Sequence, residues 1–378
     1  MPGRIFITVA ETSGDLHAAE LVRGLRAIDP ALAFEGHGGP HLREAGVLIH
    51  RQTTDRAAMG LRAIGRVMEM KRLLRWTRRV LQNNPADLHI CVDSWSINWH
   101  FARLAGKLGT PVFYYIAPQT WASRPGRLKR LRRWVDQVAC ILPFEEEYFR
   151  RHGIPATFVG HPLFDELPPH REMPPGLRFP DRPPLIGLLG GSRKSVVTHN
   201  LPRLLDAARR IRKEFPEARF IAPTTDTTDP IVRKLSAAFS SLSIRRNEFN
   251  AVAAECDLCL AVSGTAVLQA AAFGTPMVVV YHVNPLLWHL IGRWVVNTRT
   301  YSLVNLLSDH HEHLVPEFIP WHGSTGPAAE CALDLLRHPE KLEAQRQRLR
   351  HLIDTLDRPG ASANAARLAY SMLKAGPT

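Results

Sequence analysis

Short runs of apolar residues recur along this chain, and a stretch with helical periodicity follows most of them. In the first half, the strand candidates are residues 5–9, 88–92, 112–116 and 138–142, and the clearest helix candidates are residues 16–28 and 97–108. Apolar runs this short and this continuous are typical of strands buried on both faces, as in a parallel sheet covered by helices. The alternation therefore predicts an α/β fold built on doubly wound parallel sheets.

The composition changes near the middle of the chain. Eight prolines lie between residues 162 and 184, and proline suits neither a helix interior nor a central strand. We therefore expect residues 166–184 to be a linker that follows a first domain of residues 1–165. The strand-and-helix pattern then restarts at residues 185–189 and continues through a second domain, residues 185–344. We expect the two domains to face one another across a cleft.

The excess of basic over acidic residues indicates that the binding partners are negatively charged. Lys and Arg number 48 against 35 Asp and Glu, a formal net charge of +13. This excess predicts attraction to phosphorylated metabolites, anionic lipid or nucleic acid, but no nucleic-acid-binding module is recognisable. The five cysteines indicate a reducing compartment, and no signal peptide is visible. Residues 258–281 carry no charge, but glycines, a proline and polar residues interrupt them, which favours a strand, a turn, a short helix and a strand over a membrane span.

The loop after the first strand contains four candidate substrate contacts. These are Glu11, Ser13, Gly14 and Asp15. Ligands of doubly wound sheets bind where such loops leave the carboxyl ends of strands. The alternative is an ordinary helix start, with Ser13 or Asp15 as the capping residue. A second glycine-rich segment, residues 36–40, is expected to form another connecting loop and is not a dinucleotide-binding fingerprint.

Asp93 comes directly after the apolar run 88–92 and just before a predicted helix. A carboxylate at the carboxyl end of a strand can serve as a general base. It can equally cap the helix that follows. Position alone leaves both roles open.

The second half contains two loops suited to an anion. Gly190-Gly191-Ser192-Arg193 offers main-chain N–H groups, a hydroxyl and a guanidinium, and Ser263-Gly264-Thr265 repeats small donors at another helix start. Together they predict a diphosphate site, with ordinary helix capping as the alternative. The first loop lacks the Lys-Ser/Thr ending of an ATPase P-loop.

Several segments suggest contact with an anionic membrane. Basic residues cluster in residues 62–79 and 124–133, and residues 286–296 combine two tryptophans with many aliphatic side chains. Such segments suit an anionic membrane surface, although solvated helix faces and core packing are the alternatives. His310, His311 and His313 lie close together without metal-ligand spacing. We therefore expect no metal and no cofactor.

The order of these motifs resembles the lipid-A-disaccharide synthase family, glycosyltransferases of the GT-B class. The matching segments are residues 10–15, 36–40, 59–61, 115–122, 143–145, 159–163, 263–265 and 276–279, then Tyr281, Asn305 and residues 315–318. The resemblance covers nearly the whole chain. It implies two Rossmann-like domains, with a C-terminal helix from about residue 345 rejoining the first one. It also implies a protein on the cytoplasmic face of the inner membrane.

The resemblance further implies a reaction and roles for individual residues. A UDP-sugar donor, UDP-2,3-diacylglucosamine, would pass its sugar to an acylated glucosamine phosphate acceptor, with inversion at the anomeric carbon and without a metal. Asp93 matches the family's essential aspartate, and Ser192, Arg193, Ser263, Gly264 and Thr265 would hold the UDP group. Asn305 would line the substrate cleft, and Gln269 stands where a residue typically contacts the nucleotide ribose.

The sequence departs from the family near the expected site. Val196 and Gln269 replace residues that are usually glutamate, and Ser94-Trp95-Ser96-Ile97 follows Asp93 where Pro-Asp-Phe is preferred. Two alternatives therefore stay open. One is a non-catalytic or altered-specificity paralogue that binds nucleotide or lipid. The other is a related GT-B enzyme acting on UDP-sugars, such as an epimerase or another transferase.

Overall fold

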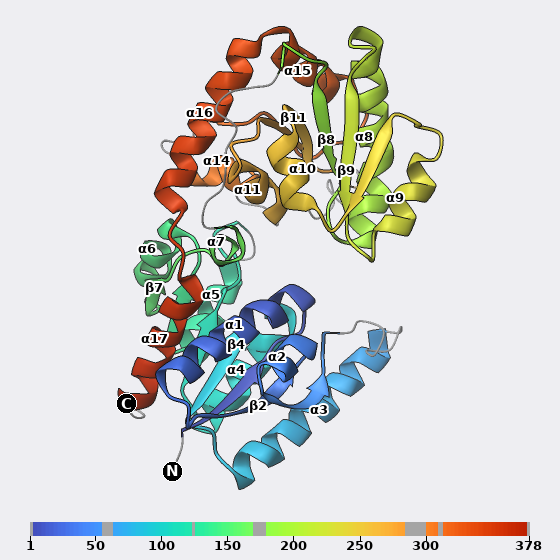
Figure 1. Cartoon of the computed structure of the whole chain (residues 1–378). Coiled ribbons are helices and arrows are strands. Elements are labelled where there is room, and N and C mark those ends of the chain that lie inside the picture. The colour runs from blue at the N-terminus through green and yellow to red at the C-terminus, as the bar shows by residue number, and fades with distance from the viewer. Residues whose placement is uncertain are drawn as a thin grey trace. The chain divides into compact units, whose positions relative to one another are not determined.

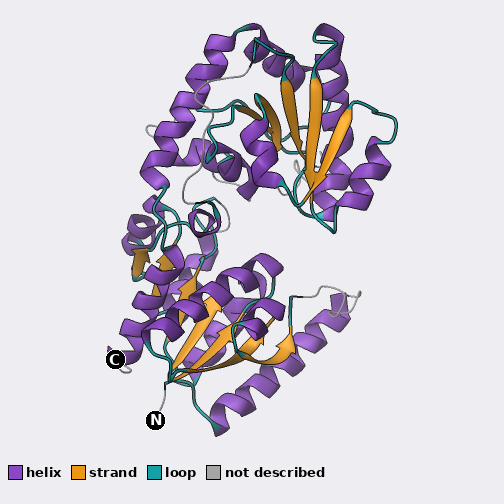
Figure 2. Ribbon diagram, viewed as in Figure 1, coloured by secondary structure: helices purple, strands orange, loops and turns teal. Residues whose placement is uncertain are grey.

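The computed structural model describes residues 3–54, 63–122, 125–168, 179–283, 300–308 and 313–375. The chain forms two compact units (Figure 1). Unit 1 comprises Met1–Glu166 and Arg358–Thr378, and unit 2 comprises Leu167–Asp357. In each unit, helices cover a parallel sheet (Figure 2). The α/β architecture predicted from the alternating pattern is thus confirmed.

The sheet of unit 1 has seven strands in the order β3-β2-β1-β4-β5-β6-β7. They are β1 (Arg4–Thr8), β2 (Ala33–Gly38), β3 (Leu48–Gln52), β4 (Leu88–Val92), β5 (Val112–Tyr115), β6 (Gln137–Cys140) and β7 (Ala156–Phe158). The chain builds outward from β1 in one direction and then returns to add β4 on the other side. The loops after β1 and β4 therefore flank the point of reversal, where ligands bind in sheets of this type.

Eight α-helices of unit 1 are described. They are α1 (Thr12–Ile28), α2 (Pro40–Glu44), α3 (Ala63–Asn83), α4 (Trp95–Lys107), α5 (Leu128–Trp134), α6 (Pro143–Arg151), α7 (Leu163–Glu166) and α17 (Ala361–Ala375). On one face of the sheet, Ile5 and Ile7 share a core with Leu21 of α1 and Ala366 of α17. On the other face, α4 and α5 contribute to a core around Tyr114. Both faces are therefore buried, which explains the continuous apolar strands.

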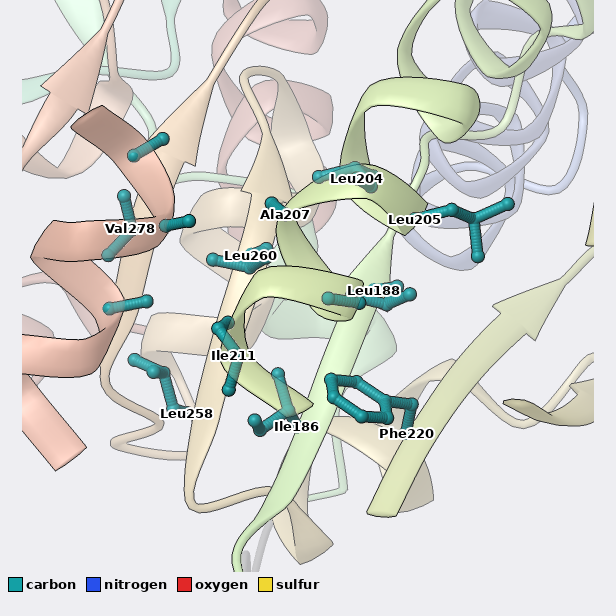
Figure 3. Close-up of a cluster of buried hydrophobic side chains, with 14 of the residues drawn as sticks. Ile186, Leu188, Leu204, Leu205, Ala207, Ile211, Phe220, Leu258, Leu260 and Val278 are labelled. Carbon is teal, nitrogen blue, oxygen red and sulfur yellow. The ribbon is translucent and has the colours of Figure 1, made fainter. Parts of the chain in front are cut away.

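Unit 2 repeats this design with the strand order β10-β9-β8-β11-β12-β13. Its strands are β8 (Leu185–Leu189), β9 (Arg219–Thr224), β10 (Leu242–Arg246), β11 (Leu258–Val262), β12 (Met277–Val280) and β13 (Glu317–Phe318). Its helices are α8 (Lys194–Glu214), α9 (Asp229–Ser236), α10 (Phe249–Glu255), α11 (Thr265–Ala271), α14 (Leu303–Leu307), α15 (Gly326–Arg337) and α16 (Pro339–Leu356). Figure 3 shows Leu188 of β8 and Leu260 of β11 in the buried cluster that α8 covers with Leu204 and Ile211.

The uncharged stretch of residues 258–281 forms β11, α11 and β12, as the sequence analysis expected. Both strands are fully buried within the sheet. Among the described helices, none combines the length and the apolar character needed to cross a membrane. Residues 59–61, 286–296, His310 and His311, together with most of the proline-rich linker, lie outside the described residues.

Two expectations about local structure were wrong. Residues 36–40 are not a loop, because Gly36, His37 and Gly38 belong to β2. Only glycine fits at position 36, because a Cβ there would lie 1.9 Å from the main-chain oxygen of Ile7. The segment that returns to unit 1 begins at Arg358 rather than near residue 345, because the apolar side of α16 is buried in unit 2.

Candidate functional site

Asp93 lies at the carboxyl end of β4 in an unusual backbone conformation. Asp93 and Ser94 have φ angles of 48° and 49°, in the left-handed region that few non-glycine residues adopt. Two such residues in succession turn the chain sharply from β4 into α4. Left-handed non-glycine residues cost free energy and persist where surrounding contacts fix them. Neighbouring groups must therefore fix this turn.

Hydrogen bonds hold the backbone of Asp93 from three sides. The Asn98 side-chain amide donates to the main-chain oxygens of Val92 and Asp93, at 2.8 Å each. The Tyr114 hydroxyl also donates to the Asp93 oxygen, at 2.7 Å. The Asp93 N–H donates to the main-chain oxygen of Tyr115 at 3.0 Å. Because Asn98 and Tyr114 are fully buried, the turn is built into the core.

The helix caps predicted near these loops are not formed. Glu11 is the N-cap residue of α1, with no side-chain capping bond, so neither Ser13 nor Asp15 caps that helix. The residue before α4 is Ser94, also without a side-chain cap. Ser94, and not Asp93, thus occupies the N-cap position of α4.

Asp15 is fully buried and joins the first turn of α1 to the start of α2. Its carboxylate accepts hydrogen bonds from the main-chain N–H of Gly39 at 2.7 Å and of His41 at 2.9 Å. Asp15, which we expected to contact substrate, therefore supports the start of α2. Glu11 is half-buried and Ser13 is exposed.

Gly14 brings the first turn of α1 against the turn that follows β4. A Cβ at this position would lie 2.7 Å from Val9 Cγ2 and 3.5 Å from Asp93 Cβ. A substitution with any larger residue would push into Val9 and contact Asp93. The structure thus places two segments that the sequence analysis singled out, Gly14 and Asp93, side by side.

The loop after β5 is tied to α6 by a buried acid. Glu145 is 1% exposed, and its Oε1 accepts a hydrogen bond from the indole Nε1 of Trp121 at 2.9 Å. Its Oε2 accepts from the main-chain N–H groups of Leu142 at 3.1 Å and Ile141 at 3.3 Å. Burial raises the pKa of Glu145 to about 7, although these three hydrogen bonds act in the opposite direction.

In unit 2, the two predicted anion loops leave neighbouring strands at the same edge. Leu189, the last residue of β8, pairs with Ala261 of β11 in parallel register. The loops at 190–193 and 263–265 therefore begin side by side. Ser192, Arg193 and Thr265 are exposed, and Gly264 lies in open space. The two loops flank the reversal point of the second sheet, between β8 and β11, where sheets of this type bind ligands.

Two other predicted site residues of unit 2 are engaged within the protein. The Gln269 amide nitrogen donates to Asn250 Oδ1 at 2.7 Å, which orients the Gln269 side chain. Asn305 is 1% exposed, and its amide bonds both the N–H of Val315 (2.9 Å) and its carbonyl oxygen (2.8 Å). Asn305, which we expected to line the substrate cleft, therefore holds the segment before β13.

Sequence reasoning missed several residues that organise these loops. Asn98 and Tyr114 lie within a predicted helix and a predicted strand, where nothing distinguishes them from core residues. Glu145 and Trp121 occur in segments matched to a family, but the pattern gave neither residue a role. A glutamate three residues after a helix-capping position is the one local signal available for Glu145. Among the described residues, no cluster of His, Cys, Asp and Glu is arranged to hold a metal ion.

Comparison with known proteins identifies the family. The family model described as lipid-A-disaccharide synthetase matches residues 5–370. A lipid-A-disaccharide synthase of Geobacter sulfurreducens is 34% identical over 376 residues, which cover 98% of this chain and 97% of that protein.

Two solved structures share the fold at low sequence identity. MurG of Acinetobacter baumannii has a TM-score of 0.58 at 16% identity, with 98% of this chain and 100% of that chain covered. A putative UDP-N-acetylglucosamine 2-epimerase of Listeria monocytogenes has a TM-score of 0.63 at 12% identity, with 98% and 96% covered. These neighbours confirm the GT-B fold class. With the match to the family model over nearly its whole length, the chain belongs to the lipid-A-disaccharide synthase family, glycosyltransferases of lipid A biosynthesis.

Proposed function

We propose that the protein transfers a 2,3-diacylglucosaminyl group from UDP-2,3-diacylglucosamine to the 6-hydroxyl of 2,3-diacylglucosamine 1-phosphate. The products are UDP and a β-1,6-linked disaccharide 1-phosphate. Family membership supports the reaction class. The observation that carries the chemical proposal is the position of Asp93, whose backbone Asn98 and Tyr114 fix at the reversal point of the first sheet.

In this proposal Asp93 is the general base. Its carboxylate accepts the proton of the acceptor hydroxyl while that oxygen attacks the anomeric carbon from the face opposite the diphosphate. The new carbon–oxygen bond forms as the bond to the diphosphate oxygen breaks, and UDP leaves with the electron pair. Attack from the opposite face inverts the anomeric carbon.

The departing UDP carries the negative charge that develops in this step. Ser192 and Arg193, at the start of the 21-residue helix α8, supply a hydroxyl, a guanidinium and the positive end of a helix dipole. Gly264 and Thr265, which follow the neighbouring strand β11, supply further donors, whereas the N–H and the hydroxyl of Ser263 donate to the main-chain oxygens of Val280 and Tyr301. Donors that are already in place stabilise a leaving group without reorganisation. Unit 2 is therefore the proposed UDP-sugar-binding domain, and unit 1 the proposed acceptor and lipid domain.

The replacement of glutamate by Gln269 is compatible with this role. Since the Gln269 amide nitrogen donates to Asn250, its Oε1 is the atom left to accept a hydrogen bond from a ribose hydroxyl. A carboxylate would accept the same bond. The proposal thus keeps the ribose contact with an uncharged side chain.

The described helices α3, α4 and α5 carry the surface that we propose meets an anionic membrane. Their exposed cations are Lys71, Arg72, Arg75, Arg78, Arg79, Arg103, Lys107, Lys129, Arg130, Arg132 and Arg133. Glu69 is the one acidic residue in these helices as the structure describes them. Each basic residue near an anionic lipid surface contributes about 1 kcal/mol. This supports a location on the cytoplasmic face of the inner membrane. Retention by phosphatidylcholine vesicles as strong as by phosphatidylglycerol vesicles would argue against it.

The decisive experiment incubates the protein with both proposed substrates and detects the phosphorylated disaccharide by mass spectrometry. Asp93→Asn removes the base but keeps the side-chain shape, so transfer should fall by about 10²- to 10⁴-fold while the fold is unchanged. Asp29→Asn, the same change at the helix end that precedes β2, is the matched control and should retain activity. Full transfer by Asp93→Asn would exclude the role of the base. Binding of UDP without turnover by the wild type would identify a non-catalytic paralogue instead.

A further inference from the structure

The segment that follows β5, residues 116–122, begins beside Asp93. The main-chain oxygen of Tyr115, which ends β5, accepts the hydrogen bond from the Asp93 N–H at 3.0 Å. The next residue, Ile116, has a φ of 59°, and its N–H donates to the oxygen of Ala139 in β6 at 3.3 Å. Loop 116–122 thus leaves the sheet one residue after the backbone partner of Asp93.

Trp121 ties the far end of this loop to α6 in two ways. Its indole N–H donates to Glu145 Oε1 at 2.9 Å, and its ring meets Phe144 edge to face, with centroids 5.0 Å apart and an interplanar angle of 81°. The packing would hold any aromatic ring of similar size. The hydrogen bond requires the indole nitrogen and the buried carboxyl group.

Burying the carboxyl group of Glu145 costs desolvation free energy. A buried carboxyl group is tolerated only when donors compensate for the lost water. Two of its three donors are main-chain N–H groups at the start of α6, a capping arrangement that serves the helix. The third donor, Trp121, lies 24 residues earlier and does not serve the helix.

We propose that the hydrogen bond between Trp121 and Glu145 fixes loop 116–122 in the position in which it helps to bind the acceptor next to Asp93. This inference rests on the proposed function, because it takes the acceptor hydroxyl to lie beside Asp93. Glu145 acts through Trp121 and is a positioning residue. The loop itself contains no ionisable side chain, so it presents a neutral surface toward the acylated sugar.

The protonation state of Glu145 should affect the fluorescence of Trp121, because the two side chains share a hydrogen bond. Burial raises the pKa of Glu145 to about 7, and the Trp121 bond is the first of the contacts that lower it. Two other groups face this region: Glu146, whose carboxylate accepts from the Phe158 N–H and pairs with Arg150, and the buried thiol of Cys140, whose pKa burial raises far above its usual value. The fluorescence of Trp121 should therefore change with pH near neutrality.

The first test is kinetic and uses Trp121→Phe, which keeps an aromatic ring against Phe144 and removes the N–H. Trp134→Phe makes the same change at a half-buried tryptophan of α5 and is the matched control. For Trp121→Phe, kcat/KM for the acceptor should fall about tenfold, the scale of one hydrogen bond to a charged group, with the KM for the donor unchanged. If Trp121→Phe is indistinguishable from Trp134→Phe, the proposal is wrong.

The second test needs no activity. The difference between the fluorescence of the wild type and that of Trp121→Phe is titrated from about pH 5 to 9. A midpoint near neutral pH that is lost in Glu145→Gln supports the hydrogen bond as the source of the signal, and a flat difference spectrum overturns it. The two tests separate the hydrogen bond from the proposed function. If the fluorescence titrates but the wild type forms no disaccharide, the hydrogen bond exists, while the proposed function and the acceptor role of the loop are both wrong.

Discussion

The side-chain amide nitrogen of Asn98 lies 2.8 Å from the main-chain oxygens of both Val92 and Asp93. One buried amide thereby joins the end of β4 to the first turn of α4 across two left-handed residues. The conformation of the proposed catalytic aspartate is set by a residue five positions later in the chain. The geometry of Asp93 can therefore be changed without touching its carboxylate.

Asn98→Ala should loosen the turn that carries Asp93. Removal of the amide leaves two main-chain oxygens without this donor, and we expect a loss of about 1–3 kcal/mol in the free energy of unfolding. Transfer should fall further than the stability loss explains, because Asp93 is no longer held. Urea unfolding and the disaccharide assay measure the two effects. Tyr114→Phe, which removes one bond to the same oxygen, should show a smaller loss in both. Wild-type behaviour of Asn98→Ala would contradict this account.

Asp165 anchors the C-terminal helix to the rest of unit 1. Its carboxylate accepts hydrogen bonds from the main-chain N–H groups of Gly360 (2.6 Å), Ala361 (3.1 Å) and Ser362 (2.9 Å) at the start of α17. Asp165→Ala should cost about 1 kcal/mol, the usual contribution of a helix cap. Hydrogen exchange should speed up in α17 first. Glu166→Ala is the neighbouring control. Equal exchange in α17 of the wild type and Asp165→Ala would rule out this anchoring.

Two buried histidines make the stability of unit 1 depend on pH. Burial lowers the pKa of His37 from 6.5 to about 3, with smaller effects of His50, His89 and Arg51. Burial alone lowers the pKa of His89 to about 3. Between pH values of about 3 and 6.5, both histidines are protonated in the unfolded chain and neutral in the folded one, so the unfolded chain binds more protons. The free energy of unfolding should therefore fall as the pH drops below about 6.5, by up to about 1.4 kcal/mol per pH unit for each histidine.

Urea unfolding at several pH values between about 5 and 7.5 measures this dependence. His89→Leu should remove the contribution of one histidine, so the slope of stability against pH should become shallower in this range. The exposed His351 provides the control, and His351→Gln should leave the slope unchanged. A slope in His89→Leu as steep as in the wild type would show that His89 does not titrate as argued.

Much of the fold could be predicted from the sequence because strands that are buried on both faces consist of nearly continuous apolar residues. The runs at residues 88–92, 185–189 and 258–262 match β4, β8 and β11. By contrast, β2 and β10 were missed. β2 contains Gly36, His37 and Gly38, whose residue types indicated a loop. β10 ends in two arginines, so it does not form a continuous apolar run. Composition misleads where a strand must fit against a close neighbour, as Gly36 does against Ile7.

The sequence by itself determined the fold class, the strand ends that carry Asp93 and the two loops proposed to bind the diphosphate, and, through its motifs, the family. These are local features: an apolar run, a turn, and a polar residue at a fixed place after a strand. Only the tertiary structure decided which polar residues are used internally. Asp15 and Asn305 are bonded to main-chain groups from segments that no local pattern could bring together. The same holds for the bonds from Asn98 to Asp93 and from Trp121 to Glu145, because a hydrogen bond depends on atoms meeting in space and not on their order in the chain.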